Sequence, residues 1–389
     1  MVLKGSYLMK FLLRIKQLPV FLLFALIFCF VSNVEARTFS AEGSDLLMGV
    51  GAENIGMSGA VSASTDDIFS LYWNPAGLAE LNSDEVAVSA MTNAEILPIN
   101  FAGAAFTTNW LGDYGLKSTI AVSYIPRLHV KSTGAFSKNE LESIFLRFAL
   151  PDLPGTFDGK IESKTKDYRI SFGFKPEHEA KWSAGFSLAR VDCTTFFCGT
   201  TARSPGEYII ETTKATAYGL NVGAKYFATP DLTFGFMFKD VNTKLDVELT
   251  TTYPDGRVKR EVMRLEFPRD ITLGVAWQVS EDKQLSFDYE NIFGTYGKYG
   301  LDFRVLRAGY KQQDGSLSYH AGLVAPLKLE SEKVGNSADD LVFPLAPSFG
   351  LSWNQGNYRL DSALFAQLLM SAVKKKVVPG FELTLTAYF

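Results

Sequence analysis

The sequence has little cysteine and little histidine, with three residues of each among 389. It also has only one long continuous apolar run, from Leu18 to Val31, and a mean hydropathy of +0.05. A bundle of transmembrane helices would need several apolar runs of about 20 residues, so that class is excluded. Because imidazole and thiolate ligands are scarce, we expect neither a metal ion nor another cofactor.

Signatures of enzymes and of nucleic-acid binding are missing as well. No Gly-x-Ser-x-Gly nucleophile motif occurs, and Gly49-x-Gly51 lacks the third glycine of a dinucleotide site. His178 lies between two glutamates in a tight turn, where a solvated charge cluster is the simplest interpretation. The formal net charge of −4 gives no reason to expect a nucleic-acid partner. We therefore predict a protein that is not an enzyme.

The N-terminus has the order of a signal peptide. Four basic residues precede the apolar run, and Val34-Glu35-Ala36 follows it with the small residues that a signal peptidase needs. We predict that residues 1–36 are removed and that the mature chain starts at Arg37; an uncleaved anchor helix is the alternative. In an exported chain, Cys193 and Cys198 are expected to form a local disulfide, with free thiols as the alternative.

From residue 85 onward, apolar and polar residues alternate, which places successive side chains on opposite faces of a strand. In the last segment Phe381, Leu383 and Leu385 form the apolar face, and Glu382 and Thr384 lie opposite. The pattern predicts an all-β fold in which residues 85–389 form one transmembrane antiparallel β-barrel. We expect about fourteen strands, near 85–92, 100–110, 116–126, 165–175, 181–192, 215–227, 231–247, 262–278, 283–292, 301–311, 315–326, 346–354, 358–369 and 380–389.

The connections between these strands alternate between two lengths. Every second connection is a short turn rich in Gly, Asp, Asn and Pro, whereas the others include long segments near 127–164, 193–214 and 327–345. Outer-membrane barrels have short periplasmic turns and long outer loops. The short turns also have tryptophans beside them, as in a membrane-interface girdle: Trp110, Trp182, Trp277 and Trp353. We therefore predict a Gram-negative-type outer-membrane protein with both barrel ends in the periplasm.

The alternation is interrupted in three places. The apolar parity slips by one residue near Asp240 and again near Leu306, which indicates a β-bulge at each position. Pro268 interrupts the strand predicted over 262–278.

Residues 37–84 precede the first barrel strand and do not alternate. They contain Gly51-Ala-Glu-Asn-Ile-Gly-Met-Ser-Gly-Ala60, then Asp66-Asp67, and then Asn74-Pro-Ala-Gly-Leu78. We predict a compact segment with tight turns at its glycines. Asp66 is expected to cap a short helix over 67–73 that ends before Pro75, and Asn74 is expected to bond its neighbours' backbone.

This motif resembles the start of the long-chain fatty-acid transporter superfamily, the FadL-like outer-membrane barrels, which include aromatic-hydrocarbon channels and PorV-like proteins of type IX secretion. Ser58 stands where the family pattern usually has glycine, and Glu53 where it often has arginine. The resemblance implies a fourteen-stranded barrel in which residues 37–84 fold inward as a hatch. The matching hatch residues are Gly56, Met57, Gly59, Ala60, Asp66, Asp67, Tyr72, Asn74, Pro75, Ala76 and Gly77.

Two predicted outer loops have features that suit ligands. Ser137 and Glu140 match a helix capping box, and the helix that follows has one apolar face, made by Leu141, Ile144, Phe145 and Phe148. We expect this face either to pack on the barrel rim or to line an apolar groove that captures substrate. Residues 374–376 are three lysines that either contact lipopolysaccharide phosphates or are simply solvated.

Together these features favour an outer-membrane channel for passive uptake of hydrophobic compounds such as long-chain fatty acids, a function that the resemblance also implies. The alternative is a PorV-like scaffold or secretion-machinery component without transport activity. The expected partners are membrane lipids, lipopolysaccharide, a hydrophobic small-molecule substrate and the outer-membrane assembly machinery. We expect that machinery to recognise the terminal Phe389, because outer-membrane barrels resemble one another in ending with an aromatic residue.

Overall fold

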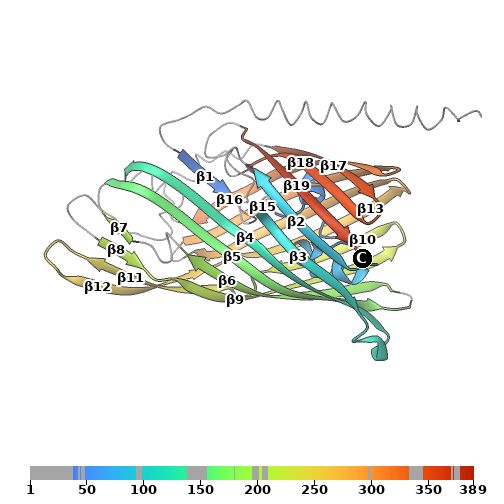
Figure 1. Cartoon of the computed structure of the whole chain (residues 1–389), viewed down its shortest axis with the longest axis horizontal. Coiled ribbons are helices and arrows are strands. Elements are labelled where there is room, and N and C mark those ends of the chain that lie inside the picture. The colour runs from blue at the N-terminus through green and yellow to red at the C-terminus, as the bar shows by residue number, and fades with distance from the viewer. Residues whose placement is uncertain are drawn as a thin grey trace, which may run out of the picture.

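The structure, a computed structural model, describes residues 38–42, 44, 49–92, 99–137, 156–178, 180–194, 201–203, 209–296, 299–332, 345–368, 371 and 377–389. Its larger sheet has fifteen strands, of which fourteen close into an antiparallel β-barrel and one, β1, pairs only with β4 (Figure 1). The predicted fold class is therefore confirmed. Closure joins the last strand to the first, because β19 pairs with β2.

The fourteen barrel strands follow the chain order and the predicted positions. They are β2 (Glu85–Thr92), β3 (Ile99–Thr108), β4 (Leu116–Ser137), β5 (Thr156–Pro176), β6 (Trp182–Thr194), β9 (Ala215–Thr229), β10 (Leu232–Lys239), β13 (Arg269–Ser280), β14 (Lys283–Tyr296), β15 (Tyr299–Asp314), β16 (Leu317–Glu332), β17 (Ala346–Gln355), β18 (Tyr358–Ala366) and β19 (Pro379–Tyr388).

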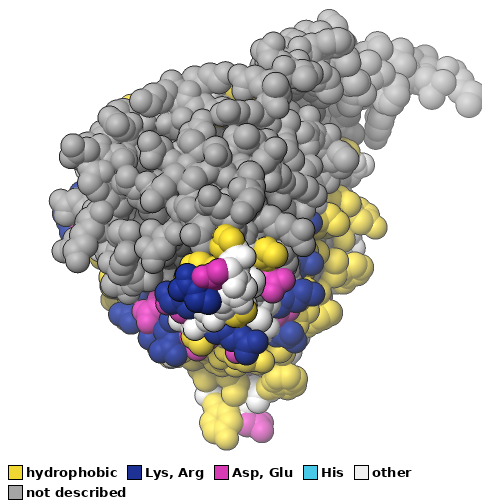
Figure 2. Space-filling view, turned by 90° about the vertical axis from the view of Figure 1, so that its left-hand side faces the viewer, with side chains coloured by type: hydrophobic (Ala, Val, Ile, Leu, Met, Phe, Trp, Pro, Cys, Tyr) yellow, Lys and Arg dark blue, Asp and Glu magenta, His cyan; other side chains and the backbone are white. Residues whose placement is uncertain are grey.

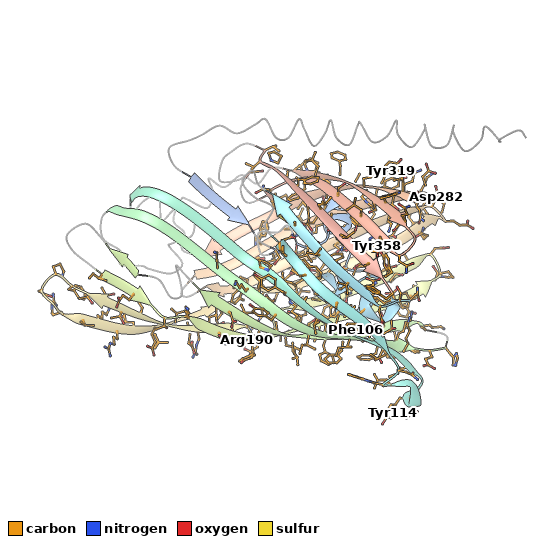
Figure 3. The ribbon with its side chains drawn as sticks, in the orientation of Figure 1. Phe106, Tyr114, Arg190, Asp282, Tyr319 and Tyr358 are labelled. Carbon is orange, nitrogen blue, oxygen red and sulfur yellow. The ribbon has the colours of Figure 1, made fainter. Side chains whose placement is uncertain are left out.

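Side chains alternate between the lumen and the outer wall along each barrel strand. In β19, Glu382 and Thr384 have no exposed surface, whereas Leu385 is 47% exposed. The exposed residues of the wall are largely hydrophobic, such as Phe106 and Tyr319 (Figure 3). Figure 2 shows hydrophobic side chains gathered along the wall, and charged side chains of both signs at the end that faces the viewer. This distribution suits a barrel whose outer wall contacts lipid.

Six tight turns lie at one end of the barrel, which we call the turn end; the opposite end is the outer end. Tyr114 and Asp282 mark the turn end in Figure 3. The terminal Phe389 also lies there, and its N–H donates to Asp84 O at 3.0 Å. All the predicted girdle tryptophans are exposed beside these turns: Trp110, Trp182, Trp277 and Trp353. None of the helices among the described residues is long and apolar enough to span a membrane.

Two predicted strands are shorter than expected, because a second sheet forms between them. The strand predicted over 231–247 ends at Lys239, and the one predicted over 262–278 begins at Arg269. Asp240 has a left-handed φ of 52°, which ends a strand rather than inserting a bulge, and Pro268 has no N–H for a ladder. The residues between them form a hairpin in a four-stranded sheet: β7 (Thr201–Arg203), β8 (Ile209–Thr212), β11 (Lys244–Thr252) and β12 (Val258–Glu266).

The segment predicted as a long loop over 127–164 is largely strand. β4 continues to Ser137 and β5 starts at Thr156, so their hairpin extends well beyond β3 at the outer end (Figure 1). Ser137 is the last residue of β4, and the predicted helix with Leu141, Ile144, Phe145 and Phe148 lies outside the described residues. The same is true of the lysines at 374–376.

The irregularity predicted near Leu306 has a different cause from a bulge in its own strand. Val305 and Arg307 are both buried and Leu306 is 43% exposed, so the parity of β15 is unbroken there. The lumen-facing side chains of β15 instead change from apolar to charged at this point. The nearby register shift leaves Leu327 of β16 unpaired, because Arg304 pairs with Lys328 and Val305 with Pro326.

Residues 49–81, which we call the plug segment, lie inside the barrel near its turn end. They contain α2 (Ala52–Gly56), α3 (Ser70–Trp73) and the 3-10 helix η2 (Pro75–Glu80). Almost all of their side chains are buried, and η2 contacts β5, β6 and β9 from within. The hatch predicted over residues 37–84 is therefore too long at its start, because β1 (Thr38–Glu42) pairs with β4 as part of the wall and does not lie in the plug segment.

Candidate functional site

The plug segment turns sharply at Asn74 and Pro75. α3 ends at Trp73, and Asn74 is extended, as residues before proline usually are. Asn74 Oδ1 accepts a hydrogen bond from Ala76 N at 3.1 Å, which confirms the predicted turn. Its Nδ2 also donates to Ser62 O at 2.7 Å and to Ala224 O at 3.1 Å in β9. This one side chain therefore holds two parts of the plug segment against the wall.

The predicted cap of the helix over 67–73 is wrong. Asp66 is exposed, and α3 has no side-chain cap at its first turn. The neighbouring Asp67 is buried instead, and its Oδ1 accepts from Phe69 N at 3.0 Å. Asp67 rather than Asp66 therefore orders this turn, while its other oxygen contacts the barrel.

Glycines of the wall allow the plug segment to pack against backbone. A Cβ on Gly185 would lie 2.3 Å from Pro75 O, and one on Gly223 would lie 2.0 Å from Asn74 Oδ1. Real side chains do not approach so closely, so only glycine fits. Eight strands each supply one such lumen-facing glycine, which together we call the glycine ring: Gly173, Gly185, Gly223, Gly235, Gly274, Gly309, Gly322 and Gly350.

Carboxylates of the wall accept hydrogen bonds from backbone N–H groups of the plug segment. These groups need outside partners, because the plug segment has little regular secondary structure of its own. Glu382 Oε1 accepts from Gly51 N at 2.8 Å, and Glu85 Oε2 accepts from Ile68 N at 2.8 Å. Asp288 Oδ2 accepts from two successive residues, Val61 N at 3.1 Å and Ser62 N at 2.9 Å. Arg307 of β15 also donates to Ser58 O at 2.9 Å, so these bonds tie the plug segment to two neighbouring pairs of strands, β19 with β2 and β14 with β15.

Buried ion pairs complete this attachment. Arg359 Nη2 lies 2.6 Å from Asp67 Oδ2, and its Nη1 lies 3.3 Å from Glu53 Oε2. Lys311 also pairs with Glu53, and His320 Nε2 is 3.8 Å from Glu53 Oε1. Burial by itself would raise the pKa of Glu53, but Lys311 and Arg359 together hold it well below its usual range. Glu53 is therefore a buried anion that is matched to cations of the wall.

The face of the plug segment toward the outer end is aromatic and is covered by cations. Lys239 Nζ lies 4.6 Å from the ring centre of Tyr72 and 5.4 Å from that of Trp73. Arg169 lies 5.4 Å from the Tyr72 ring and pairs with Asp167 at 2.6 Å. The space lined by Gly59, Ser62, Trp73, Lys239, Thr272, Asp288, Glu290 and Arg307 leaves no room for a water molecule. The lumen beside this part of the plug segment is filled.

Beyond the plug segment toward the outer end, the lumen-facing residues of β15 become apolar. On β15 the order is Lys311 and Arg307, which contact the plug segment, and then Val305 and Phe303. Val305 has no exposed surface and Phe303 is 4% exposed. They belong to one buried cluster, which we call the outer apolar cluster: Phe303, Val305, Val324, Ala346 and Leu368. Its position on four neighbouring segments makes it the apolar part of the lumen nearest to the plug segment on this side.

The remaining predicted site residues divide into those inside the barrel and those that the structure does not describe. Met57 and Gly77 are buried in the plug segment with the rest of the motif, Asp66 apart. Cys193, near the outer end of β6, is disulfide-bonded. Cys198 lies outside the described residues, so the pairing of these two cysteines stays a prediction.

No protein-family model and no curated protein sequence matches the chain. Solved structures do match. The Ralstonia pickettii toluene transporter TbuX is 14% identical, with a TM-score of 0.59 over 88% of this chain and 99% of that chain. The chain has the fold of the FadL-like channels. A Pseudomonas aeruginosa FadL homologue is 11% identical with a TM-score of 0.57, covering 90% of this chain and 98% of that one.

A third similar structure is the CymD monoaromatic hydrocarbon channel, 13% identical with a TM-score of 0.56 over 88% of this chain and 98% of that chain. Each of these three FadL-like structures is covered almost completely, so the match includes the plug region as well as the barrel. The structural neighbours therefore agree with the resemblance drawn from the motif over residues 51–78.

Sequence reasoning missed two groups of site residues. The glycine ring consists of glycines at lumen-facing positions of the alternating pattern, so their parity was a visible signal. The charged residues that hold the plug segment, such as Arg359 and Asp288, lie on the polar face of the same strands. Their parity predicts that they face the lumen, but their partners in the plug segment become apparent only in the folded barrel.

Proposed function

We propose that the protein is an exported outer-membrane channel that takes up hydrophobic compounds passively. The observation that carries the proposal is the outer apolar cluster, which faces the lumen directly beyond the plug segment. A lumen that served only water or ions would be lined by polar side chains at the positions of Phe303 and Val305, which are apolar and buried. Support also comes from the fold, which is shared with structures titled as toluene transporters, a monoaromatic hydrocarbon channel and a FadL homologue.

The proposed path has three stages. Compounds are first captured at the outer loops, where Leu141, Ile144, Phe145 and Phe148 supply apolar surface. They next enter the lumen at the outer apolar cluster, where burial of apolar surface favours them by about 0.8 kcal/mol per methylene. They then leave without displacing the plug segment, because its ion pairs and backbone bonds fix it to the wall. The path needs no cofactor and no energy source.

Long-chain fatty acids and small aromatic hydrocarbons are the two proposed ligand classes. Both bury apolar surface, and the fold neighbours include structures titled as toluene transporters and as a FadL homologue. The predicted signal peptide, residues 1–36, would deliver the chain for insertion into the outer membrane, with the turn end in the periplasm.

A binding measurement on the purified protein tests the site. The double variant Val305→Thr and Val324→Thr keeps the side-chain shapes but adds hydroxyls to the outer apolar cluster. Desolvating a hydroxyl costs about 1–3 kcal/mol, so we expect at least a roughly 5-fold weaker affinity for a fluorescent long-chain fatty acid and for toluene. Val122→Thr is the control, because Val122 is 44% exposed on the outer wall. Equal affinities for all three proteins would refute the proposed site.

A PorV-like scaffold remains the second candidate function, favoured by the filled lumen beside the plug segment. A scaffold needs its outer surface and not its lumen. It therefore predicts no binding of either ligand class at the outer apolar cluster, which the same measurement reports.

A further inference from the structure

The apolar band of the outer wall ends at the same level on four neighbouring strands, β4, β5, β6 and β9. Strand pairing places their outward side chains in rows that run across the strands. One row is apolar: Val122, Ile170, Leu188 and Leu220. The next row toward the outer end has three tyrosines and an arginine: Tyr124, Tyr168, Arg190 and Tyr218. The row beyond it is mainly polar: Pro126, Lys166, Asp192 and Thr216.

These rows lie at the level of the outer membrane interface. Trp182 belongs to the girdle at the turn end, and Arg190 lies about 26 Å farther along β6 at roughly 3.3 Å per residue. Because barrel strands are tilted, this length spans most of the apolar band, which is about 25 Å tall in outer-membrane barrels. Tyrosine favours such an interface, because its ring is apolar and its hydroxyl stays hydrated. Figure 3 shows Arg190 on the wall, well away from Tyr114 at the turn end.

Two cations of these rows have hydrogen-bond donors available to an external partner. The Arg190 side chain is 57% exposed, and its Nε donates to Asp192 at 3.1 Å. Lys166 Nζ lies 6.0 Å from the ring centre of Tyr124. Within the part of the chain that the structure describes, no residue accepts a hydrogen bond from Lys166 Nζ or from the two terminal nitrogens of Arg190. Asp192 also accepts from the Thr216 hydroxyl at 2.9 Å, so the protein already provides partners for this carboxylate.

The spacing of the two cations suits a single phosphate. Lys166 lies opposite Asp192 and Tyr168 lies opposite Arg190, so Lys166 and Arg190 are diagonal neighbours on adjacent strands. Diagonal positions are about 7–8 Å apart, within reach of long side chains that converge on one group. Arginine offers a fork of donors that matches phosphate, and lysine adds a point charge. Lys164, two residues nearer to the outer end of β5, adds positive charge on the same face.

The surface next to these cations is apolar and open to lipid. Val122, Ile170 and Leu188 are all exposed on the wall. A free anion would use the cations and leave this apolar surface uncovered. A lipid with a phosphorylated head group matches both, because its acyl chains cover the apolar row while its phosphate meets Lys166 and Arg190.

We propose that this part of the wall binds one phosphorylated lipid of the outer leaflet, with lipopolysaccharide as the occupant. We call it the outer lipid site, and it consists of Tyr124, Lys166, Tyr168, Arg190 and Tyr218. The phosphate lies between Lys166 and Arg190, the head-group sugars contact the tyrosine rings, and the acyl chains run along the apolar row. The site lies on the outside of the barrel, so it does not depend on the proposed uptake function.

A titration of the purified protein in detergent with fluorescent diphosphoryl lipid A tests the site. The variant Lys166→Gln with Arg190→Gln removes both cations, and we expect at least roughly 10-fold weaker binding. The control, Lys259→Gln with Arg264→Gln, removes the same charge from β12, where both side chains are half exposed or more. It should bind within about 2-fold of the wild type, since exposed charges away from the lipid are screened. Heat-modifiable migration on gels shows that each variant is folded.

The other outcomes would overturn the proposal. Equal binding by the wild type and the Lys166→Gln, Arg190→Gln protein would show that these cations do not hold the lipid. An equal loss in both double variants would show general attraction to a basic surface instead of a site. Dephosphorylated lipid A should bind the wild type and the Lys166→Gln, Arg190→Gln protein alike, and an unequal result would contradict recognition of the phosphate. Displacement of lipid A by inorganic phosphate would identify a site for free anions and refute the lipid as occupant.

Discussion

At the residue scale, Ser58 shows why the motif usually has glycine at its position. Ser58 has a left-handed φ of 56°, which costs most residues about 1–2 kcal/mol relative to glycine. Here the serine hydroxyl is 2.7 Å from Ser348 Oγ of β17. A side-chain hydrogen bond contributes about 1 kcal/mol, so it offsets much of the backbone cost. Serine can therefore replace the usual glycine at position 58 while the plug backbone keeps its conformation.

Arg359 is the single residue on which the charge balance of the plug segment depends most. It contacts Asp67 and Glu53 in the plug segment and Asp361 in its own strand. We predict that Arg359→Met destabilises the folded barrel by about 3–5 kcal/mol, because buried carboxylates are left without their cation. Thermal unfolding of the purified protein in detergent measures the change.

The matched control for this prediction is an exposed ion pair. Arg264 and Asp246 pair at 2.7 Å in the outer hairpin, where both side chains are more than half exposed. Since solvent screens such pairs, Arg264→Met should leave the unfolding temperature almost unchanged. A similar loss in both variants would show that the buried network has no special role.

At the element scale, the plug segment and the barrel are shaped for each other. The glycine ring lets wall backbone and plug backbone touch, so any added methyl group must move one of them. We predict that Gly223→Ala displaces Asn74 and loosens the plug segment, since the new Cβ would lie 2.0 Å from Asn74 Oδ1. The measurement is the rate of protease cleavage within residues 49–81 of the folded protein.

Gly219→Ala, on the same strand, is the control for Gly223→Ala. A Cβ there would meet the Thr243 hydroxyl at 2.3 Å, and its three nearest heavy atoms belong to Thr243 and Asp240 rather than to the plug segment. That variant should keep the plug segment protected. Equal cleavage of the two variants would refute a specific fit at the glycine ring.

The bounds of a strand could be predicted from the sequence only where its alternating pattern was clearly interrupted. Strand ends were close to the predicted positions where alternation was bounded by a short turn, as at Trp182 and Trp353. The slip of parity near Asp240 was interpreted as a bulge, because alternation resumes beyond it in β11, whereas the chain leaves the barrel there. That change is made by a backbone angle at Asp240 and by pairing of β11 with β8, a long-range contact that no local pattern encodes.

The plug segment was predictable in kind but not in detail. Its glycines, Asn74 and Pro75 predicted a compact turn-rich segment, and the turn at Asn74 is as expected. The sequence assigned a helix cap to Asp66, because either aspartate could supply an oxygen by spacing alone, whereas α3 has no side-chain cap and Asp67 orders the turn before it. Burial decided between them, since Arg359 draws Asp67 inward and leaves Asp66 in solvent.

At the scale of the whole molecule, assembly and stability should depend on different residues. Phe389 is 76% exposed at the end of β19, and one hydrogen bond joins its N–H to Asp84. We predict that deleting Phe389 lowers the yield of assembled barrel several-fold, because the assembly machinery is expected to read the terminal aromatic residue. The unfolding temperature of the barrel that does form should change little.

The comparison uses the heat-modifiable fraction on gels for yield, and thermal unfolding of the purified fraction for stability. Deleting the exposed turn residue Gly256 instead provides a length-matched control far from the C-terminus. Equal yields with and without Phe389 would contradict its proposed role in assembly.

The central claim for the whole molecule is that hydrophobic compounds reach the cell through this barrel. The most direct test is the initial uptake rate of labelled toluene and of a labelled long-chain fatty acid by cells that carry the protein, compared with matched cells that lack it. The account predicts that the protein raises uptake of at least one compound and that Val305→Thr with Val324→Thr reduces this gain at equal surface levels. Uptake of both compounds that is independent of the protein would contradict the account and favour the scaffold.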